Sequence, residues 1–254
     1  MASKPLDTLS RISWMMTSVI SLLAVWWIAA LLIQSRYLPL PQDVFSILAT
    51  ELANGELLFH VSMTLMRVAA SFLVAMVIGS AIGIAMGRQA WADRLFDGWL
   101  MFFLNLPALV TIVLCFIWFG LTEVATVFAV AINKIPNVAV TLREGTRALD
   151  PAYEQLARAY RFKQWKTLRH VLLPQLAPYF AAAARSGLAL VWKIVLVVEL
   201  LGRSNGVGFQ IHLYFQLFDV AAILAYAISF IVVVQLIETF ILQPWQQSAV
   251  RWRT

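Results

Sequence analysis

Residues Glu144 to Pro174 read EGTRALDPAYEQLARAYRFKQWKTLRHVLLP and form the only long polar segment of the chain. Asp150 followed by Pro151 predicts a helix start, because the carboxylate can accept free amide groups of the first turn and proline at the first helical position loses no hydrogen bond. Glu154 lies in the first turn and basic residues follow it, an order that suits the helix dipole. Apolar side chains recur at helical spacing at Leu156, Ala157, Tyr160, Trp165 and Leu168. We therefore expect a helix over residues 151–165 whose apolar face docks against another surface.

The spacing of this segment resembles the cytoplasmic "EAA" loop of the permease subunits of bacterial ABC importers. The family pattern is E-A-A, three residues, G, nine residues, and then an aliphatic residue, one further residue and L-P. With Ala157 on the second alanine, that end falls without a gap on Val171, Leu173 and Pro174. Gln155 stands where the glutamate is expected, and Arg161 stands where the glycine is expected. In the family this loop forms a short coupling helix that fits a groove of the ATP-hydrolysing subunit. The alternative is a basic amphipathic helix lying on anionic lipid, which would not require the downstream register.

The resemblance implies that one group of loop residues couples to the ATPase subunit, namely Asp150, Glu154, Gln155, Ala157, Arg158, Tyr160, Arg161 and Lys163. Glycine in the family's loop permits a bend between two short helices, since it alone takes positive φ freely. For Arg161 we therefore expect either a more continuous helix or a partner groove with an acidic residue facing the guanidinium. An exposed Arg161 at a sharp bend would contradict both expectations.

The composition of the chain places most of it in a membrane. Of its 254 residues, 61% are hydrophobic and only 13% are charged, which is about half the charged fraction of a typical soluble domain. Lipid offers backbone groups no outside partner, so we expect an all-α polytopic membrane protein with a single transmembrane domain over residues 1–254. The resemblance implies that this domain is a permease. Cys115 is the only cysteine, so one chain can form no disulfide, and its apolar surroundings predict a buried core thiol.

Six apolar segments are long enough to cross a bilayer, at about residues 14–34, 61–87, 99–119, 122–142, 175–201 and 220–242. Pro107 interrupts the third segment, which we expect to be kinked or broken into two helices. Residues 44–58 are expected to form a short helix on the outer surface. In the second segment, small residues at every fourth position predict close packing against a neighbouring helix, at Ala75, Gly79, Gly83 and Gly87.

Basic residues are distributed unevenly between the two sides of the membrane. With the N-terminus inside, only Arg36 and Arg203 fall in outer segments. Thirteen fall in cytoplasmic segments: Lys4, Arg11, Arg88, Arg94, Arg143, Arg147, Arg158, Arg161, Lys163, Lys166, Arg169, Arg251 and Arg253. This bias predicts that both termini and the loop 144–174 lie in the cytoplasm. The net charge of +6 therefore reflects membrane topology, and we expect no nucleic-acid partner.

Charged side chains within the apolar segments are candidates for a transport pathway, because charges at membrane depth usually face a bundle interior or a watery path. On a helical wheel, one stripe of the fifth segment carries Arg185, Trp192 and Glu199, with Lys193 about 100° to one side. The proposed pathway residues are Lys134, Arg185, Trp192, Lys193 and Glu199. A structural ion pair is the alternative for each charge, for example Glu199 with Arg203 one turn on. Arg67 in the second segment is expected to snorkel or to pair structurally, with a contact to the substrate as the alternative.

Further motifs extend the resemblance over nearly the whole chain. They are T-L-x-R-V at residues 64–68, the stretch from Pro107 to I-W-F-G at 117–120, and S-N-G-V-G at 204–208. These motifs are similar to the branch of ABC permeases that handles nitrate, taurine and aliphatic sulfonates, although the branch's second proline is missing at Thr111 and Ile112. The resemblance implies a permease subunit of the bacterial inner membrane, present as a homodimer with two ATPase subunits and a periplasmic or lipid-anchored solute-binding protein. It also implies a small anionic substrate, which the excess of cations at membrane depth favours.

Several functional classes are disfavoured by residues that the sequence lacks. His60, His170 and His212 are scattered without carboxylates or cysteine at ligand spacing, so we expect no metal site. No G-x-x-x-x-G-K-[ST] loop occurs, so we expect no cofactor and no enzymatic activity in this chain, with ATP bound by a partner subunit. An ATP-independent secondary transporter or channel remains the alternative; inverted repeats would favour it, and the two halves show no similarity. An intramembrane enzyme would need paired aspartates or a Ser/His arrangement, which the apolar segments do not contain.

Overall fold

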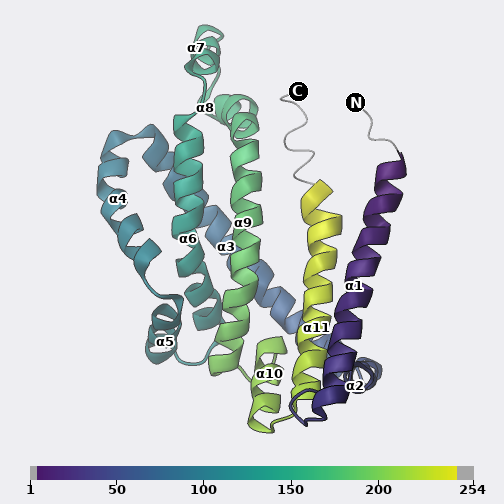
Figure 1. Cartoon of the computed structure of the whole chain (residues 1–254). Coiled ribbons are helices and arrows are strands. Elements are labelled where there is room, and N and C mark those ends of the chain that lie inside the picture. The colour runs from purple at the N-terminus through teal and green to yellow at the C-terminus, as the bar shows by residue number, and fades with distance from the viewer. Residues whose placement is uncertain (1–4, 245–254) are drawn as a thin grey trace.

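The computed structural model describes residues 5–244, and all regular structure in this part of the chain is helical (Figure 1). Lys4, Arg251 and Arg253 lie outside the described residues, as does the side chain of Arg11. The elements in order are α1 (Pro5–Ile33), α2 (Pro41–Ala53), α3 (Glu56–Arg88), α4 (Ala90–Asn105), α5 (Ala108–Phe119), α6 (Glu123–Arg147), α7 (Pro151–Ala159), α8 (Gln164–Thr167), the π-helical turn η1 (Leu168–Leu172), α9 (Leu173–Gly202), α10 (Val207–Gln216), α11 (Val220–Ile237) and the π-helical turn η2 (Glu238–Leu242). The all-α prediction is confirmed.

Five helical segments are long and apolar enough to cross a membrane: Met16–Ile33, Glu56–Arg88, Glu123–Arg147, Trp165–Gly202 and Val220–Ile241. Helices α4 and α5 meet at an angle of 99° and make a sixth if the bent pair counts as one span. The break falls at Leu106 and Pro107, both of which have extended backbone. The expected interruption at Pro107 is therefore confirmed, and the expected number of six spans is reached when the bent pair counts as one span.

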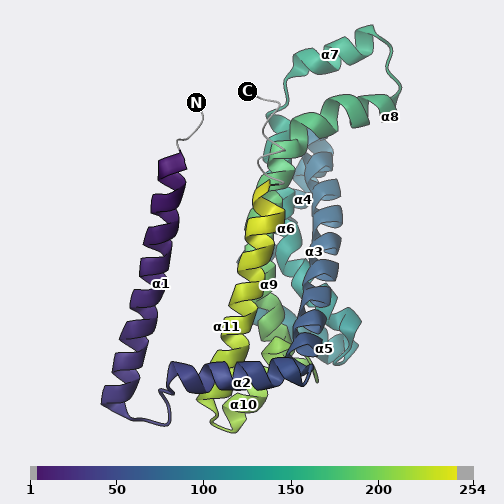
Figure 2. The same ribbon diagram turned by 90° about the vertical axis from the view of Figure 1, so that its right-hand side faces the viewer.

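The long helices α3, α6, α9 and α11 form the body of the molecule, and α1 stands apart from it (Figures 1 and 2). Helices α2 and α10 lie at one end, and α7 and α8 project from the opposite end. We call the end that carries α2 and α10 the α10 end, and the end that carries α7 and α8 the α7 end. At the α10 end, the indole N–H of Trp26 in α1 donates to the carbonyl of Pro39 at 3.1 Å.

Close packing of α3 against α6 follows from the small-residue stripe of α3. A Cβ atom on Gly79 would lie 2.7 Å from Cβ of Val138, and one on Gly83 would lie 2.9 Å from Cβ of Leu142. Any larger side chain would therefore push the two helices apart, and the predicted role of the stripe is confirmed. Cys115 in α5 is 2% exposed and belongs to the apolar core, as expected.

The short outer helix differs from its predicted bounds of 44–58. Helix α2 begins at Pro41, where proline suits the first turn, and ends at Ala53. Gly55 then takes a φ of +82° at low steric cost, and the chain turns there from α2 into α3, which runs in a different direction (Figure 2). Residues 56–58 consequently open α3 instead of closing the preceding helix.

Candidate functional site

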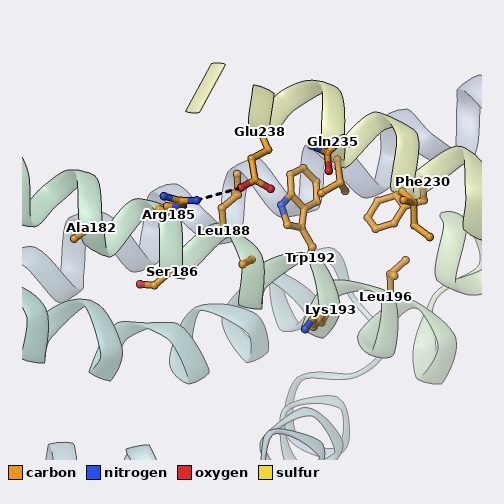
Figure 3. Close-up of a pocket in the computed structure, with 13 residues that line it drawn as sticks. Ala182, Arg185, Ser186, Leu188, Trp192, Lys193, Leu196, Phe230, Gln235 and Glu238 are labelled. Carbon is orange, nitrogen blue, oxygen red and sulfur yellow. Dashed lines mark ion pairs between the residues drawn. The ribbon is translucent and has the colours of Figure 1, made fainter. Parts of the chain in front are cut away.

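A cavity of about 770 Å³ lies between α9 and α11. Figure 3 shows its lining, in which side chains of α9 face those of α11 and η2. Helix α9 contributes Arg185, Ser186, Trp192 and Lys193, and the opposite wall contributes Phe230, Gln235 and Glu238. The size and the mixed lining suit a small solute, because ligand sites are commonly apolar hollows with a few convergent polar groups.

The charged groups of the cavity are two cations and one anion. Nη2 of Arg185 lies 3.9 Å from Oε1 of Glu238, and the two side chains are 61% and 38% exposed (Figure 3). Lys193 lies eight residues beyond Arg185 along α9, which corresponds to about 12 Å of helix. The cavity therefore carries one more positive than negative side chain.

Two aromatic rings meet across the cavity, one from α9 and one from α11. Trp192 and Phe230 pack edge to face, with ring centroids 5.8 Å apart and planes at 76°. Trp192 is only 7% exposed, so packing in the core holds its ring in place. The two rings offer apolar surface beside the cationic groups.

The cavity brings together some of the predicted pathway residues but not all of them. Arg185, Trp192 and Lys193 line it, whereas Lys134 and Glu199 do not. Lys134 is 1% exposed and lies against the face of α9 turned away from the cavity: a Cβ atom on Gly187 would be 2.6 Å from Cε of Lys134. Sequence reasoning missed Gln235 and Glu238 as lining residues, because only the packing of α11 on α9 turns them toward Arg185.

Glu199 belongs instead to a buried polar network at the α10 end, centred on Arg67. The Arg67 guanidinium donates through Nη1 to Oε1 of Glu199 at 2.6 Å and through Nη2 to Oε1 of Glu123 at 2.7 Å. Arg67 is 1% exposed and Glu199 is 0% exposed. The expected structural pairing of Arg67 is thus observed, but the suggested pair of Glu199 with Arg203 is wrong. Arg203 pairs with Glu123 because its side chain points from the end of α9 toward the start of α6.

This network also holds the segment S-N-G-V-G between α9 and α10. The backbone N–H of Gly206 donates to Nδ1 of His60 at 3.0 Å, that of Val207 to Oγ1 of Thr64 at 2.9 Å, and that of Gly208 to Oε2 of Glu199 at 2.9 Å. The motifs at 64–68 and 204–208 are therefore two sides of one contact. The sequence alone did not reveal this contact, since about 140 residues separate its partners.

The loop 144–174 begins its helix where the sequence predicts. The Asp150 carboxylate accepts the N–H of Ala152 at 2.8 Å, and α7 starts at Pro151. The predicted helix over 151–165 is wrong, however, because α7 ends at Ala159 and α8 starts only at Gln164.

Arg161 makes the bend that separates α7 from α8. It takes a left-handed φ of +52° and is exposed, so both expectations for this residue are wrong. The N–H of Phe162 donates to the carbonyl of Ala157 at 2.9 Å, which closes the end of α7 as a Schellman motif with Arg161 at the left-handed position. The family's glycine fits this position, and arginine adopts the same conformation here.

The predicted coupling residues divide into buried and exposed ones. Ala157 is 3% exposed in the single chain, whereas Tyr160 is 71% exposed. Asp150, Gln155, Arg161 and Lys163 are also exposed, and the side chains of Glu154 and Arg158 lie outside the described part of the structure. The apolar face expected to dock is therefore presented mainly by Leu156, Tyr160 and Trp165.

Comparison with known proteins relates these features to a family. Residues 75–252 match the family model described as "Binding-protein-dependent transport system inner membrane component". The chain is 27% identical over 247 residues to a Bacillus subtilis protein named as an aliphatic sulfonates transport permease, covering 96% of this chain and 89% of that protein. It is also 27% identical over 198 residues to the taurine transport system permease protein of Escherichia coli, covering 75% and 72%.

A solved structure shares the fold. The crystal structure of an amino acid ABC transporter with histidines superimposes with a TM-score of 0.63 at 19% sequence identity. The match covers 80% of this chain and 98% of the other. The helical arrangement seen here is therefore one that an ABC transporter chain also adopts.

Proposed function

The chain belongs to the family of binding-protein-dependent transport system inner membrane components, and we propose that it forms the solute pathway of an ATP-driven ABC importer for a small anion. Its membership confirms the resemblance to importer permeases that the loop 144–174 and the other motifs predicted. It is a multi-pass permease subunit of the inner membrane. The proposal adds the energy source, the pathway and the charge of the solute.

The observation that carries the proposal is the charge of the cavity between α9 and α11. Arg185 and Lys193 face it together with the single carboxylate of Glu238, while Trp192 and Phe230 provide apolar walls. A cationic side chain that lines a cavity attracts an anion that enters it and can donate charge-assisted hydrogen bonds to that anion. The names of two relatives, which refer to aliphatic sulfonates and to taurine, point to sulfonates as the solute class to test first.

Partners and orientation complete the proposal. The α7 end faces the cytoplasm, where each of two ATPase subunits binds one loop 144–174, and the chain itself binds no cofactor. A solute-binding protein delivers the anion at the α10 end. Two copies of this single transmembrane domain pair with their cavities facing the shared pathway, which agrees with the exposure of Arg185 and Lys193 in one chain. ATP binding by the partner subunits would then switch the cavity between outward and inward access.

Reconstitution tests this function. The chain, with its ATPase and binding protein, is placed in proteoliposomes, and uptake of a labelled alkyl sulfonate, taurine and nitrate is measured with and without ATP. ATP-dependent uptake of an anion is expected. Lys193→Met should reduce this uptake by about tenfold or more, as loss of one charge-assisted contact implies, while Lys193→Arg should retain it. Uptake without ATP, a neutral or cationic ligand in the binding protein, or unchanged uptake in Lys193→Met would contradict the proposal.

A further inference from the structure

The pair of Arg185 and Glu238 lies on the side of the cavity nearer the α7 end, with Ala182 beyond it. Helix α9 runs from the α7 end to the α10 end and α11 runs back (Figure 1), and Figure 3 shows Arg185 and Glu238 facing each other. The cavity continues from this pair past Lys193 to Leu196 and Phe230. A solute that moves along the cavity from the α10 end therefore meets Lys193 first and the ion pair last.

The geometry of this pair suits a contact that opens and closes. Its nitrogen–oxygen distance of 3.9 Å is long and both side chains are partly exposed, whereas Arg67 and Glu199 lie 2.6 Å apart and are fully buried. A buried pair cannot be separated without leaving a desolvated charge. A partly exposed pair contributes little to stability, so it can be exchanged for another anion at low cost.

The backbone is irregular in the wall that carries Glu238. The π-helical turn η2 starts at Glu238 itself. Such turns are rare and occur frequently at functional sites, because the extra residue interrupts the regular hydrogen bonding of the helix. Glu238 is thus held on a segment that differs from the rest of α11.

We propose that Glu238 is an internal substitute for the transported anion. Its carboxylate holds Arg185 while the cavity is empty, and an anion passing from Lys193 displaces it and binds the guanidinium. Carboxylates and sulfonates both match the fork of N–H donors that arginine presents. Displacement breaks this link between η2 and α9 and widens the cavity toward the α7 end. This role rests on the proposed function, since it needs an anion in the cavity.

Kinetics of three variants test this role in the reconstituted complex with a labelled alkyl sulfonate. Glu238→Gln removes the competing carboxylate and should lower the KM for uptake by about two- to fivefold, the range expected for a partly exposed ion pair. It should also raise ATP hydrolysis measured without the binding protein and its ligand. Arg185→Gln should raise the KM and raise the same basal hydrolysis. The exchanged variant Arg185→Glu/Glu238→Arg should return basal hydrolysis to the wild-type level.

A matched control is available in Asp97 of α4, whose carboxylate lies 2.7 Å from Nη1 of Arg143 in another partly exposed pair outside the cavity. Asp97→Asn should leave both the KM and basal hydrolysis unchanged. If the wild-type complex takes up no anion with ATP, the proposed function fails and this role fails with it. If the wild type transports but Glu238→Gln has an unchanged or higher KM, or the exchanged variant keeps high basal hydrolysis, only the role of Glu238 is overturned.

Discussion

The buried carboxylate of Glu199 allows a quantitative prediction about what holds the α10 end together. It accepts hydrogen bonds from Nη1 of Arg67 at 2.6 Å, from Oγ1 of Thr64 at 2.9 Å and from the N–H of Gly208 at 2.9 Å. Glu199→Ala would remove all three acceptor contacts from a position with no exposure to solvent. We expect this substitution to lower the free energy of unfolding by several kcal/mol.

The size of this loss follows from which hydrogen-bond partners remain for Arg67, Thr64 and Gly208 when the Glu199 carboxylate is removed. Breaking a buried ion pair costs about 3–5 kcal/mol. Arg67 retains Glu123, and the Thr64 hydroxyl retains the carbonyl of His60, so the lower end of that range applies to the pair. The N–H of Gly208 is left without its acceptor, which adds about 1–3 kcal/mol. The sum is about 4 kcal/mol.

Glu238→Ala provides the matched control, because it removes the same carboxylate from a pair that is 3.9 Å apart and partly exposed. Its expected cost is below about 1 kcal/mol. Unfolding of the purified chain by denaturant, followed by tryptophan fluorescence, measures both variants against the wild type. A loss for Glu199→Ala no larger than that for Glu238→Ala would refute the conclusion that buried charge pairing stabilises the α10 end.

Three further predictions concern the loop 144–174. An impermeant thiol reagent on intact cells should leave Tyr160→Cys unmodified and label Gln42→Cys, both of which are exposed; labelling of Tyr160→Cys would reverse the predicted topology. Arg161→Gly should preserve uptake and stabilise the loop by up to about 1 kcal/mol, because glycine takes the observed φ of +52° without strain. Greater protease sensitivity of the loop in this variant would contradict the expected stabilisation. Ala157→Glu should release α7 from its packing and weaken copurification of the ATPase, because burying a carboxylate costs several kcal/mol. Ala152→Glu, at an exposed position, should not weaken it. Equal copurification of both variants would show that the packing of Ala157 is not needed.

The sequence predicted features that depend on local chemistry and missed those that depend on distant partners. The break at Pro107, the cap at Asp150 and the close approach of Gly79 to α6 each follow from the residue and its immediate neighbours. The pairing of Glu199 with Arg67 could not be derived, because a helical wheel shows only which residues share a face of one helix. The lining role of Glu238 was missed for the same reason, since it depends on the packing of α11 against α9.

Arg161 shows why a departure from a family pattern does not require a departure in structure. A left-handed φ costs a non-glycine residue about 1–2 kcal/mol, yet the bend forms because the residues on both sides specify it. The N–H of Phe162 reaches the carbonyl of Ala157, and the ammonium of Lys166 lies 4.3 Å from the Phe162 ring centroid, a contact worth about 0.5–1 kcal/mol. Helix α10 ends in the same way, with Phe218 at a φ of +54° and the N–H of Asp219 bonded to the carbonyl of Tyr214 at 2.9 Å. In both places the Schellman hydrogen bond and the packing around it select the conformation, so the glycine of the pattern lowers the strain of the bend without being the cause of it.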